Sequence, residues 1–233
     1  MGLNMDTHAV GWLNDAIIAE WQEQYGITGL HMQAVEEPVP AVRGFVRSPF
    51  NPLIYHSVKQ AAAGTAIASE LAPDRKGILL GSLFVDAVTE EETWKDLLQG
   101  KKLSPIMFPQ SVPSAVIGYL AKELDIHGPM SCMGASRDGL AILLQQAIDW
   151  LEDDEADAVQ VVCCDVPSIR AELWARQFAN RSFGGGAVSF VIERRSWATK
   201  QGRDSRLSIA ELLELGRESA HGRFHGMAFG LEE

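Results

Sequence analysis

Residues 128–139, GPMSCMGASRDG, decide how the rest of this chain is interpreted. After Gly-Pro, the small and apolar residues predict a short strand, and the polar residues that follow predict a bend. The next segment, residues 137–153, has the apolar spacing of a helix. A nucleophile on such a bend would lie at a helix N-terminus, where the helix dipole and exposed backbone N–H groups stabilise negative charge. The two candidates are Cys132 in the strand and Ser136 in the bend.

Short strands and helices alternate on both sides of this bend. The expected strands are residues 6–13, 76–84, 129–134, 157–166 and 187–195. The expected helices are residues 15–25, 57–71, 89–98, 111–124, 137–153 and 169–178, and a further patch of helical apolar spacing covers residues 207–215. Residues 33–52 contain four prolines and are expected to form an irregular connection. This alternation predicts an α/β layered domain.

The composition excludes several classes of protein. The 233 residues are 46% hydrophobic, which suffices for a sizeable core, and the formal net charge of −11 disfavours binding to nucleic acid. No apolar stretch approaches the roughly 20 residues that span a bilayer, and the first residues lack the basic and apolar regions of a secretion signal. Cys163 and Cys164 lie in an apolar run, so we expect small buried side chains in a reducing compartment. We therefore expect a soluble cytoplasmic protein.

Several segments around the bend resemble, in order and spacing, the N-terminal half of a β-ketoacyl synthase of the thiolase fold. Residues 108–129, FPQSVPSAVIGYLAKELDIHGP, resemble the family's segment in which a Phe-Pro start leads through a helix to the Gly-Pro strand. Residues 181–194, RSFGGGAVSFVIER, resemble the glycine-turned strand that closes the first half. The resemblance covers about residues 50–195 and implies an α/β, thiolase-like fold with a single layered α-β-α half. We expect one domain over residues 1–233, with residues 196–233 as an unassigned tail.

In the family, the bend carries a Thr-Ala-Cys triplet whose cysteine is the nucleophile. Placing Gly134-Ala135-Ser136 on that triplet puts Ser136 at the cysteine's position, four residues after Cys132. A serine nucleophile needs an adjacent general base, and the family's two histidines come from the second half of the fold. Of the six histidines here, four stand singly in unrelated segments and two share a tail with glycines. We expect Ser136 to be an inert remnant, Cys132 to be a buried structural thiol, and no catalytic residue, cofactor or metal site.

A half fold with a degenerate nucleophile suggests a non-catalytic companion of a complete β-ketoacyl synthase. Thiolase-type enzymes pair the strand before the nucleophile across a two-fold axis, which places Met130, Cys132 and Met133 at the expected interface. An unpaired edge of this kind would invite aggregation. The family includes such companions, called chain-length factors, and this chain resembles the short ones of bacterial aryl-polyene synthesis. The implied partners are a complete synthase, in a heterodimer or higher assembly, and indirectly an acyl-carrier protein.

Three residues are candidates for shaping the partner's acyl tunnel: Phe108, Gln110 and Tyr119. Simple packing at the interface is an equal alternative for the two aromatic residues.

Two other functions stay open at this point. One is a small acyltransferase or thioesterase that uses Ser136 or Cys132 with a histidine supplied by folding or by a partner. The other is a homodimeric module that binds an acylated carrier without catalysis.

Overall fold

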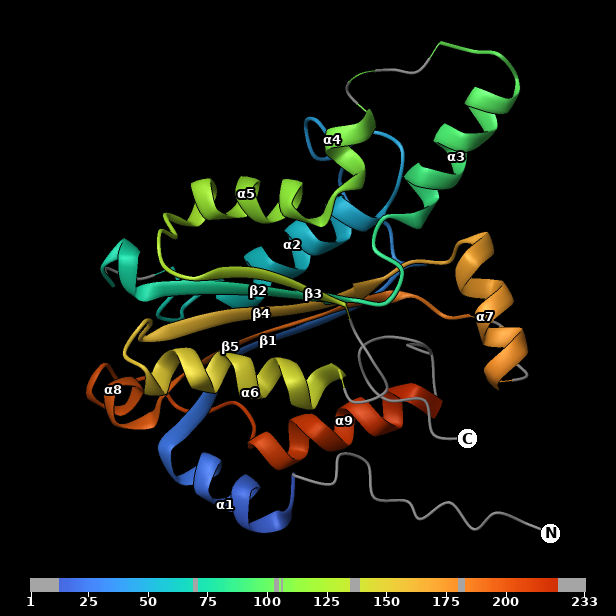
Figure 1. Cartoon of the computed structure of the whole chain (residues 1–233). Coiled ribbons are helices and arrows are strands. Elements are labelled where there is room, and N and C mark those ends of the chain that lie inside the picture. The colour runs from blue at the N-terminus through green and yellow to red at the C-terminus, as the bar shows by residue number, and fades with distance from the viewer. Residues whose placement is uncertain are drawn as a thin grey trace, which may run out of the picture.

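The computed structural model describes residues 13–68, 71–102, 105, 107–134, 139–179 and 183–221, except for the side chains of residues 108–109, 178–179 and 216–221. A five-stranded sheet lies between two layers of helices (Figure 1), as the alternation of short strands and helices predicts. Most of the strand expected at residues 6–13 lies outside the described residues, and Leu13 is not in a strand. Every helix within the described ranges is too short or too polar to cross a lipid bilayer.

The sheet has the strand order β1-β5-β4-β2-β3. Its strands are β1 (Tyr25–Ala34), β2 (Lys76–Ser82), β3 (Met130–Gly134), β4 (Ala158–Asp165) and β5 (Gly186–Arg194). β2 is parallel to both β3 and β4, whereas β5 is antiparallel to β4 and β1. β2 and β4 are buried along their whole length, which explains why their sequences are continuous rather than alternating apolar runs. β1 is not predicted by the sequence, because its two glycines and its polar residues are typical of a connection.

One face of the sheet is covered by α2 (Phe50–Ala62) and α5 (Pro113–Leu124), with the short α4 (Met107–Ser111) before α5. Their apolar residues form one core with the sheet, including Leu53, Val58, Leu80, Val116 and Leu120. α2 approaches β1 so closely that a Cβ on Gly29 would lie 2.0 Å from the carbonyl oxygen of Ala61. The helix expected at residues 57–71 begins seven residues earlier, at Phe50, because Pro52 is tolerated in a first helical turn. It ends at Ala62, and Gly64 has a φ of +75°, which does not continue an α-helix.

The opposite face is covered by α6 (Gly139–Glu152) together with α1 (Asp15–Gln24) and α9 (Ile209–His221) (Figure 1). The short α8 (Arg195–Lys200) packs against β1 and β5 at the β1 edge of the sheet, with Trp197 against the core of the α2 side. Trp21 of α1 and Leu212 of α9 belong to the same buried cluster as Leu144 of α6. The patch of helical spacing at residues 207–215 thus becomes the first half of α9, which seals this face.

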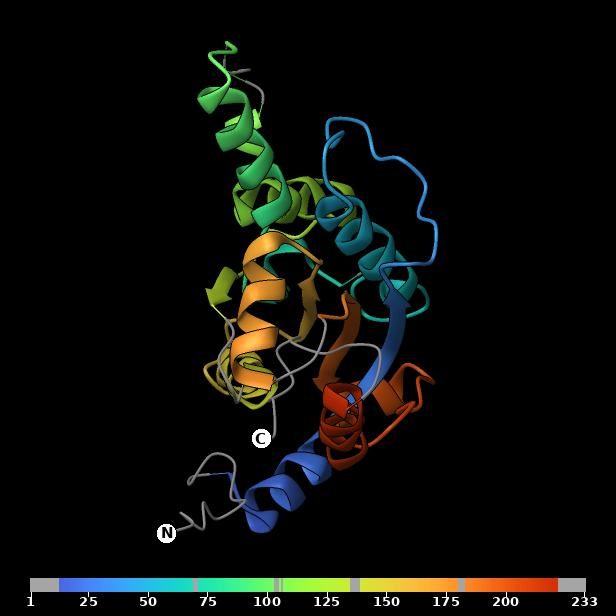
Figure 2. The same ribbon diagram turned by 90° about the vertical axis from the view of Figure 1, so that its right-hand side faces the viewer.

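Two further helices, α3 (Ala87–Leu98) and α7 (Ile169–Ala179), lie at the carboxyl end of the parallel strands, and α3 projects from the body of the molecule (Figures 1 and 2). Asp86 caps α3 by accepting a hydrogen bond from the Thr89 N–H at 3.2 Å. Glu91 of α3 accepts hydrogen bonds from the first N–H groups of α7, those of Ile169 at 3.0 Å and Arg170 at 2.9 Å. These bonds fix the two helices relative to each other.

Candidate functional site

The strand before the bend, β3, is the last strand of the sheet. In the described part of the chain it pairs with β2 alone, with Met130 opposite Ile78 and Cys132 opposite Leu80. Its outer backbone N–H and C=O groups therefore form an edge that another strand can pair with. The strand was predicted correctly from the sequence, and the structure adds that no other described segment pairs with its outer edge.

The side chains of β3 divide between the two faces of the sheet. Met130 and Cys132 lie on the face of α2 and α5, since their partners Ile78 and Leu80 belong to that core. Met130 is 52% exposed and Cys132 is also exposed, whereas Met133 packs against the core on the α6 side. The expectation that Cys132 is buried is wrong for the single chain. Its methionine neighbours suggested a packed environment, but an edge strand lacks a neighbour on one side.

Exposure does not make Cys132 an activated nucleophile. Partial burial raises the pKa of the Cys132 thiol, so the reactive thiolate is disfavoured. Cys163 and Cys164 are fully buried in β4, as expected, and desolvation raises the pKa of both thiols.

Ser136 belongs to residues 135–138, which lie outside the described residues. The elements on either side are in place: β3 ends at Gly134 and α6 begins at Gly139, so the expected strand and the expected helix are confirmed. Three histidines have described side chains, and each lies away from the carboxyl end of β3. His31 is in β1 at the opposite edge of the sheet, His56 contacts the Pro40 carbonyl oxygen at 2.9 Å, and His127 precedes the start of β3.

A buried carboxylate at the end of β4 organises the loop beside β3. Asp165 is fully buried and accepts hydrogen bonds from Ser82 Oγ at 2.7 Å, from Leu83 N and from Phe84 N. Desolvation raises the pKa of Asp165 to about 7, and the three hydrogen bonds act against that rise. The same loop holds Val85 at a φ of +55°, which is strained for a β-branched residue. Sequence reasoning missed this site, because its donors lie about 80 residues earlier in the chain.

Gln110, a tunnel candidate, lies at the junction of α2, α3 and α4. It is 7% exposed, and its backbone carbonyl accepts a hydrogen bond from Asn51 Nδ2 at 3.0 Å. The same nitrogen donates to Asp86 Oδ2 at 3.2 Å, and burial raises the pKa of Asp86. Gln110 therefore helps to join three helices within this chain.

Tyr119, another tunnel candidate, is half-buried in an aromatic cluster between α5 and α2. Its ring meets Phe45 and Tyr55 edge to face, with centroid distances of 5.8 and 5.7 Å. Phe108 lies in α4, but its side chain is outside the described residues. The structure thus brings Gln110 and Tyr119 near the layer of α2 and leaves Phe108 unplaced.

Large apolar side chains are exposed on one part of the molecule. Within the described residues they are Val46, Trp94, Leu97, Leu98, Met130, Ile169 and Leu173. Those after Val46 lie on α3, β3 and α7, and Val46 precedes Arg47, which bonds to Glu92 of α3 at 3.2 Å. None of these exposed side chains lies on α1, α6, α8 or α9, as far as the side chains of these helices are described.

Residues 86–211 match the family described as "Beta-ketoacyl synthase, N-terminal domain". The match covers more than half of the 233 residues. The chain belongs to the β-ketoacyl synthase N-terminal-domain family. The mixed sheet between two helical layers is accordingly the thiolase-like N-terminal half of a ketosynthase, as the sequence implied. The search of curated proteins finds no match to the chain.

Solved ketosynthase structures share the fold. One is the ketosynthase ApeO in complex with its chain length factor ApeC from Xenorhabdus doucetiae, with a TM-score of 0.58 and 15% identity over 73% of this chain and 79% of that chain. Another is the β-ketoacyl synthase from Burkholderia phymatum STM815, with a TM-score of 0.60 and 12% identity. The latter match covers 78% of this chain and 62% of that chain. This family member thus spans about three fifths of the Burkholderia synthase.

A third structure, the ishigamide ketosynthase/chain length factor, has a TM-score of 0.60 and 12% identity over 78% of this chain and 61% of that chain. At these identities, the likeness establishes the fold of the family member and leaves its activity to be argued from its own residues.

Proposed function

We propose that this protein is a non-catalytic, chain-length-factor-like partner of a complete β-ketoacyl synthase in fatty-acid or polyketide-type chain elongation. The observation that carries the proposal is the open edge of β3, with Met130 and Cys132 exposed beside it. In the family, this strand pairs antiparallel across a two-fold axis, so a synthase would supply the missing neighbour. Pairing would satisfy the edge N–H and C=O groups and remove apolar surface of Met130 from water.

The face of the sheet opposite to α2 and α5 offers little apolar surface to a partner. α1 and α9 pack together with α6 on this face, and Trp21, Ile209 and Leu212 are each at most 5% exposed. The exposed large apolar side chains of the described residues lie elsewhere, among them Met130 on β3. This distribution favours β3 over the α6 side as the proposed interface.

The described site groups favour a non-catalytic role. The Cys132 thiol has a raised pKa, and the described histidine side chains lie away from the end of β3. A condensing nucleophile needs a base or a stabilised thiolate, and this surrounding supplies neither to Cys132. We propose the same for Ser136, which takes the position of the family's cysteine. The catalytic residues of the complex would then belong to the synthase.

The proposal also covers the class of pathway, the acyl carrier and the residues that influence the acyl tunnel. The short chain-length factors of aryl-polyene synthesis suggest the class of pathway, and carrier-bound acyl chains would reach the complex through the synthase. Phe108, Gln110 and Tyr119 would influence the tunnel. For Gln110 and Tyr119 the influence would act through the packing of α4 and α5, because both side chains lie among residues of this chain.

The proposal is tested by reconstituting the protein with the ketosynthase that co-purifies with it from the native cell. Native mass spectrometry is expected to show a heterodimer, or a multiple of it. Hydrogen exchange is expected to slow across residues 130–134 on binding while that of α1, on the far side of α6, stays unchanged. Equal exchange of β3 with and without the synthase would contradict the assigned interface.

A separate measurement tests the enzymatic alternative. The isolated chain is treated with an acyl-thioester probe and with a serine-reactive probe, followed by peptide mapping. We expect no rapid labelling of Ser136 or Cys132. Stoichiometric acylation of either residue, followed by turnover without a synthase, would favour a small acyltransferase or thioesterase instead.

A further inference from the structure

The projecting end of α3 exposes apolar side chains that the proposed β3 interface does not include. Trp94, Leu97 and Leu98 are 57%, 44% and 83% exposed. Their spacing of three and four residues places them on one face of the helix. α3 extends beyond the helical layer of α2 and α5 (Figures 1 and 2), so these side chains lie at a protruding end of the molecule. We refer to residues 94–102, WKDLLQGKK, as the α3 tip.

The charge of the α3 tip is opposite in sign to that of the whole chain. The tip has three basic residues, Lys95, Lys101 and Lys102, and one acidic residue, Asp96, which gives it a formal net charge of +2. The net charge of the chain is −11. Lys95 and Lys102 are exposed, and neither takes part in an ion pair with another described residue. The tip is therefore a local positive region beside exposed apolar surface.

The carboxylates nearest to the tip are paired on the other side of the helix. Glu92 and Asp96 lie two residues before and after Trp94, which places both on the face opposite to that ring. Arg47 pairs there with both carboxylates, at 3.2 and 3.6 Å, and Lys101 pairs with Asp96 at 2.8 Å. These acidic groups therefore do not interrupt the apolar face.

The other two carboxylates of α3 lie near its beginning and bind α7. Glu90 forms an ion pair with Arg170 at 2.9 Å, and Glu91 accepts hydrogen bonds from the backbone N–H groups of Ile169 and Arg170. These contacts hold the beginning of α3 against the body of the molecule. The lysines of the tip are thus the charges closest to its exposed apolar side chains.

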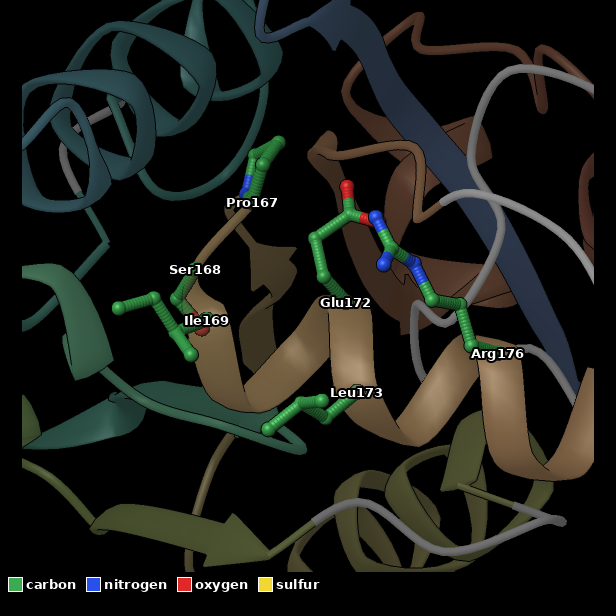
Figure 3. A pocket seen from close by; sticks show the side chains of 6 residues that line it. All are labelled: Pro167, Ser168, Ile169, Glu172, Leu173 and Arg176. Atoms are coloured by element: carbon green, nitrogen blue, oxygen red, sulfur yellow. The ribbon is translucent and has the colours of Figure 1, made fainter.

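The exposed apolar residues of α7 form a different kind of surface. Ile169 and Leu173 line a shallow pocket of about 420 Å³ (Figure 3). The residues that line this pocket include one carboxylate, that of Glu172, and one guanidinium, that of Arg176. The α7 pocket therefore has no excess charge of either sign, and its exposed apolar residues serve as a control for those of the α3 tip.

We propose that the α3 tip docks on an anionic lipid surface, with Trp94, Leu97 and Leu98 inserted among the headgroups. Aromatic and aliphatic side chains beside lysines are typical of segments that lie in a membrane interface. Lys95 and Lys102 would face the anionic headgroups. An acidic protein could also pair with these lysines, but that pairing would not require three large apolar side chains at a protruding end. The observations therefore favour a lipid surface.

This contact would be weak and reversible, because only a few apolar side chains enter the interface. It does not depend on the proposed ketosynthase partner, since the tip and the edge of β3 are separate parts of the surface and the isolated chain is sufficient for the test. If both proposals hold, the protein would locate the synthase at a membrane surface.

Co-sedimentation of the full chain with lipid vesicles tests the inference. We expect binding to vesicles of phosphatidylcholine with phosphatidylglycerol at low salt, and at least about tenfold weaker binding to phosphatidylcholine alone or at high salt. Trp94→Ser with Leu98→Ser should weaken binding at least about tenfold, because apolar surface is lost from the contact. The matched control, Ile169→Ser with Leu173→Ser, removes two exposed apolar side chains from α7 and should bind as the wild type does.

A charge variant tests the part assigned to the lysines. Lys95→Gln should weaken binding to the anionic vesicles about fivefold, the effect of one basic residue close to such a surface. Lys200→Gln, at an exposed lysine of α8, should leave binding unchanged. Equal losses for the two variants would indicate a general attraction of the chain and would overturn the assignment to the tip.

Fluorescence quenching tests which tryptophan enters the lipid. Phospholipids with brominated acyl chains should quench the bound wild-type chain but not Trp94→Phe, which keeps an apolar ring and therefore its binding. Quenching that persists in Trp94→Phe would show that another part of the protein enters the lipid. The absence of binding to anionic vesicles, or equal binding of the α3 and α7 serine variants, would also overturn the proposal.

Discussion

The two sides of this domain differ in how much apolar side-chain surface they expose to water. On the α6 side, α1 and α9 bury apolar residues such as Trp21 and Leu212 in a continuous core. On the side formed by β3, α3 and α7, apolar side chains such as Met130, Leu98 and Leu173 stay exposed. Apolar surface exposed to water is costly unless another chain segment covers it. The exposed apolar side chains on β3, α3 and α7 therefore mark that side as the candidate binding surface. Under the proposed function, this contrast assigns the partner to the side of β3, α3 and α7.

The largest effect is expected from a charge on the open edge. Met130→Asp should abolish association with the synthase, lowering affinity by at least about a hundredfold, since a charge buried without a partner costs several kcal/mol. The control is Ala19→Asp, at an exposed residue of α1 on the α6 side of the domain. Size-exclusion chromatography with and without the synthase measures both variants. An unchanged complex with Met130→Asp would move the interface away from β3.

The next largest effect concerns folding stability on the closed face. Leu212→Ala should lower the free energy of unfolding by about 2–5 kcal/mol, because the side chain is 1% exposed and its removal leaves a cavity against α6. Leu173→Ala on α7, at 61% exposure, should change it by no more than about 0.5 kcal/mol. Urea titration of the isolated chain decides this. Equal losses for the two leucines would erase the distinction between the faces.

A pH effect is expected from the buried carboxyl beside the open edge. The pKa of Asp165 rises from 3.8 to about 7 on folding, so the folded state binds the proton more tightly. Its contribution to stability is therefore full below about pH 4 and is lost as the pH rises through 7, with a slope of at most about 1.4 kcal/mol per pH unit. Asp165→Asn should flatten the dependence between pH 5 and 8, measured by urea unfolding at each pH. A variant with the wild-type slope would exclude Asp165 as the titrating group.

A moderate effect is expected on the product of the complex. Tyr119→Ala removes a ring packed against Phe45 and Tyr55, which should loosen α5 and admit a longer acyl chain. We expect the carrier-bound products to shift by at least one two-carbon extension while total turnover falls modestly. Mass spectrometry of the intermediates provides the measurement. If Phe108→Ala, Gln110→Ala and Tyr119→Ala all assemble and leave chain length unchanged, the protein only stabilises its partner.

The smallest effect is expected at the nucleophile position itself. Ser136→Ala should leave assembly and turnover nearly unchanged, because a hydroxyl without a base contributes little to a condensation. Turnover of the reconstituted complex is the appropriate assay. A fall in turnover of more than about a hundredfold, the scale expected for loss of a catalytic group, would show that Ser136 takes part in the reaction.

The sequence alone determined the elements whose residues carry their own signal. β2 and β4 are continuous apolar runs, α5 begins at Pro113, and α6 follows a bend of small residues, so each was placed to within a few residues. The order of these elements was enough to indicate the ketosynthase half. β1 was not predicted, because its two glycines and its polar residues resemble a connection. Its pairing with β5 is visible only in the structure.

What only the tertiary structure decided is which surfaces each element shares. Cys132 looks like a core residue in its own strand, and it is exposed because β3 has no outer neighbour among the described strands. Asp165 looks like the polar end of a strand, and its donors come from a loop about 80 residues away. α9 has an amphipathic sequence, and only its packing against α6 shows that it belongs to the core on this face of the sheet. Local sequence determines periodicity, whereas burial depends on contacts between segments that are distant in the chain.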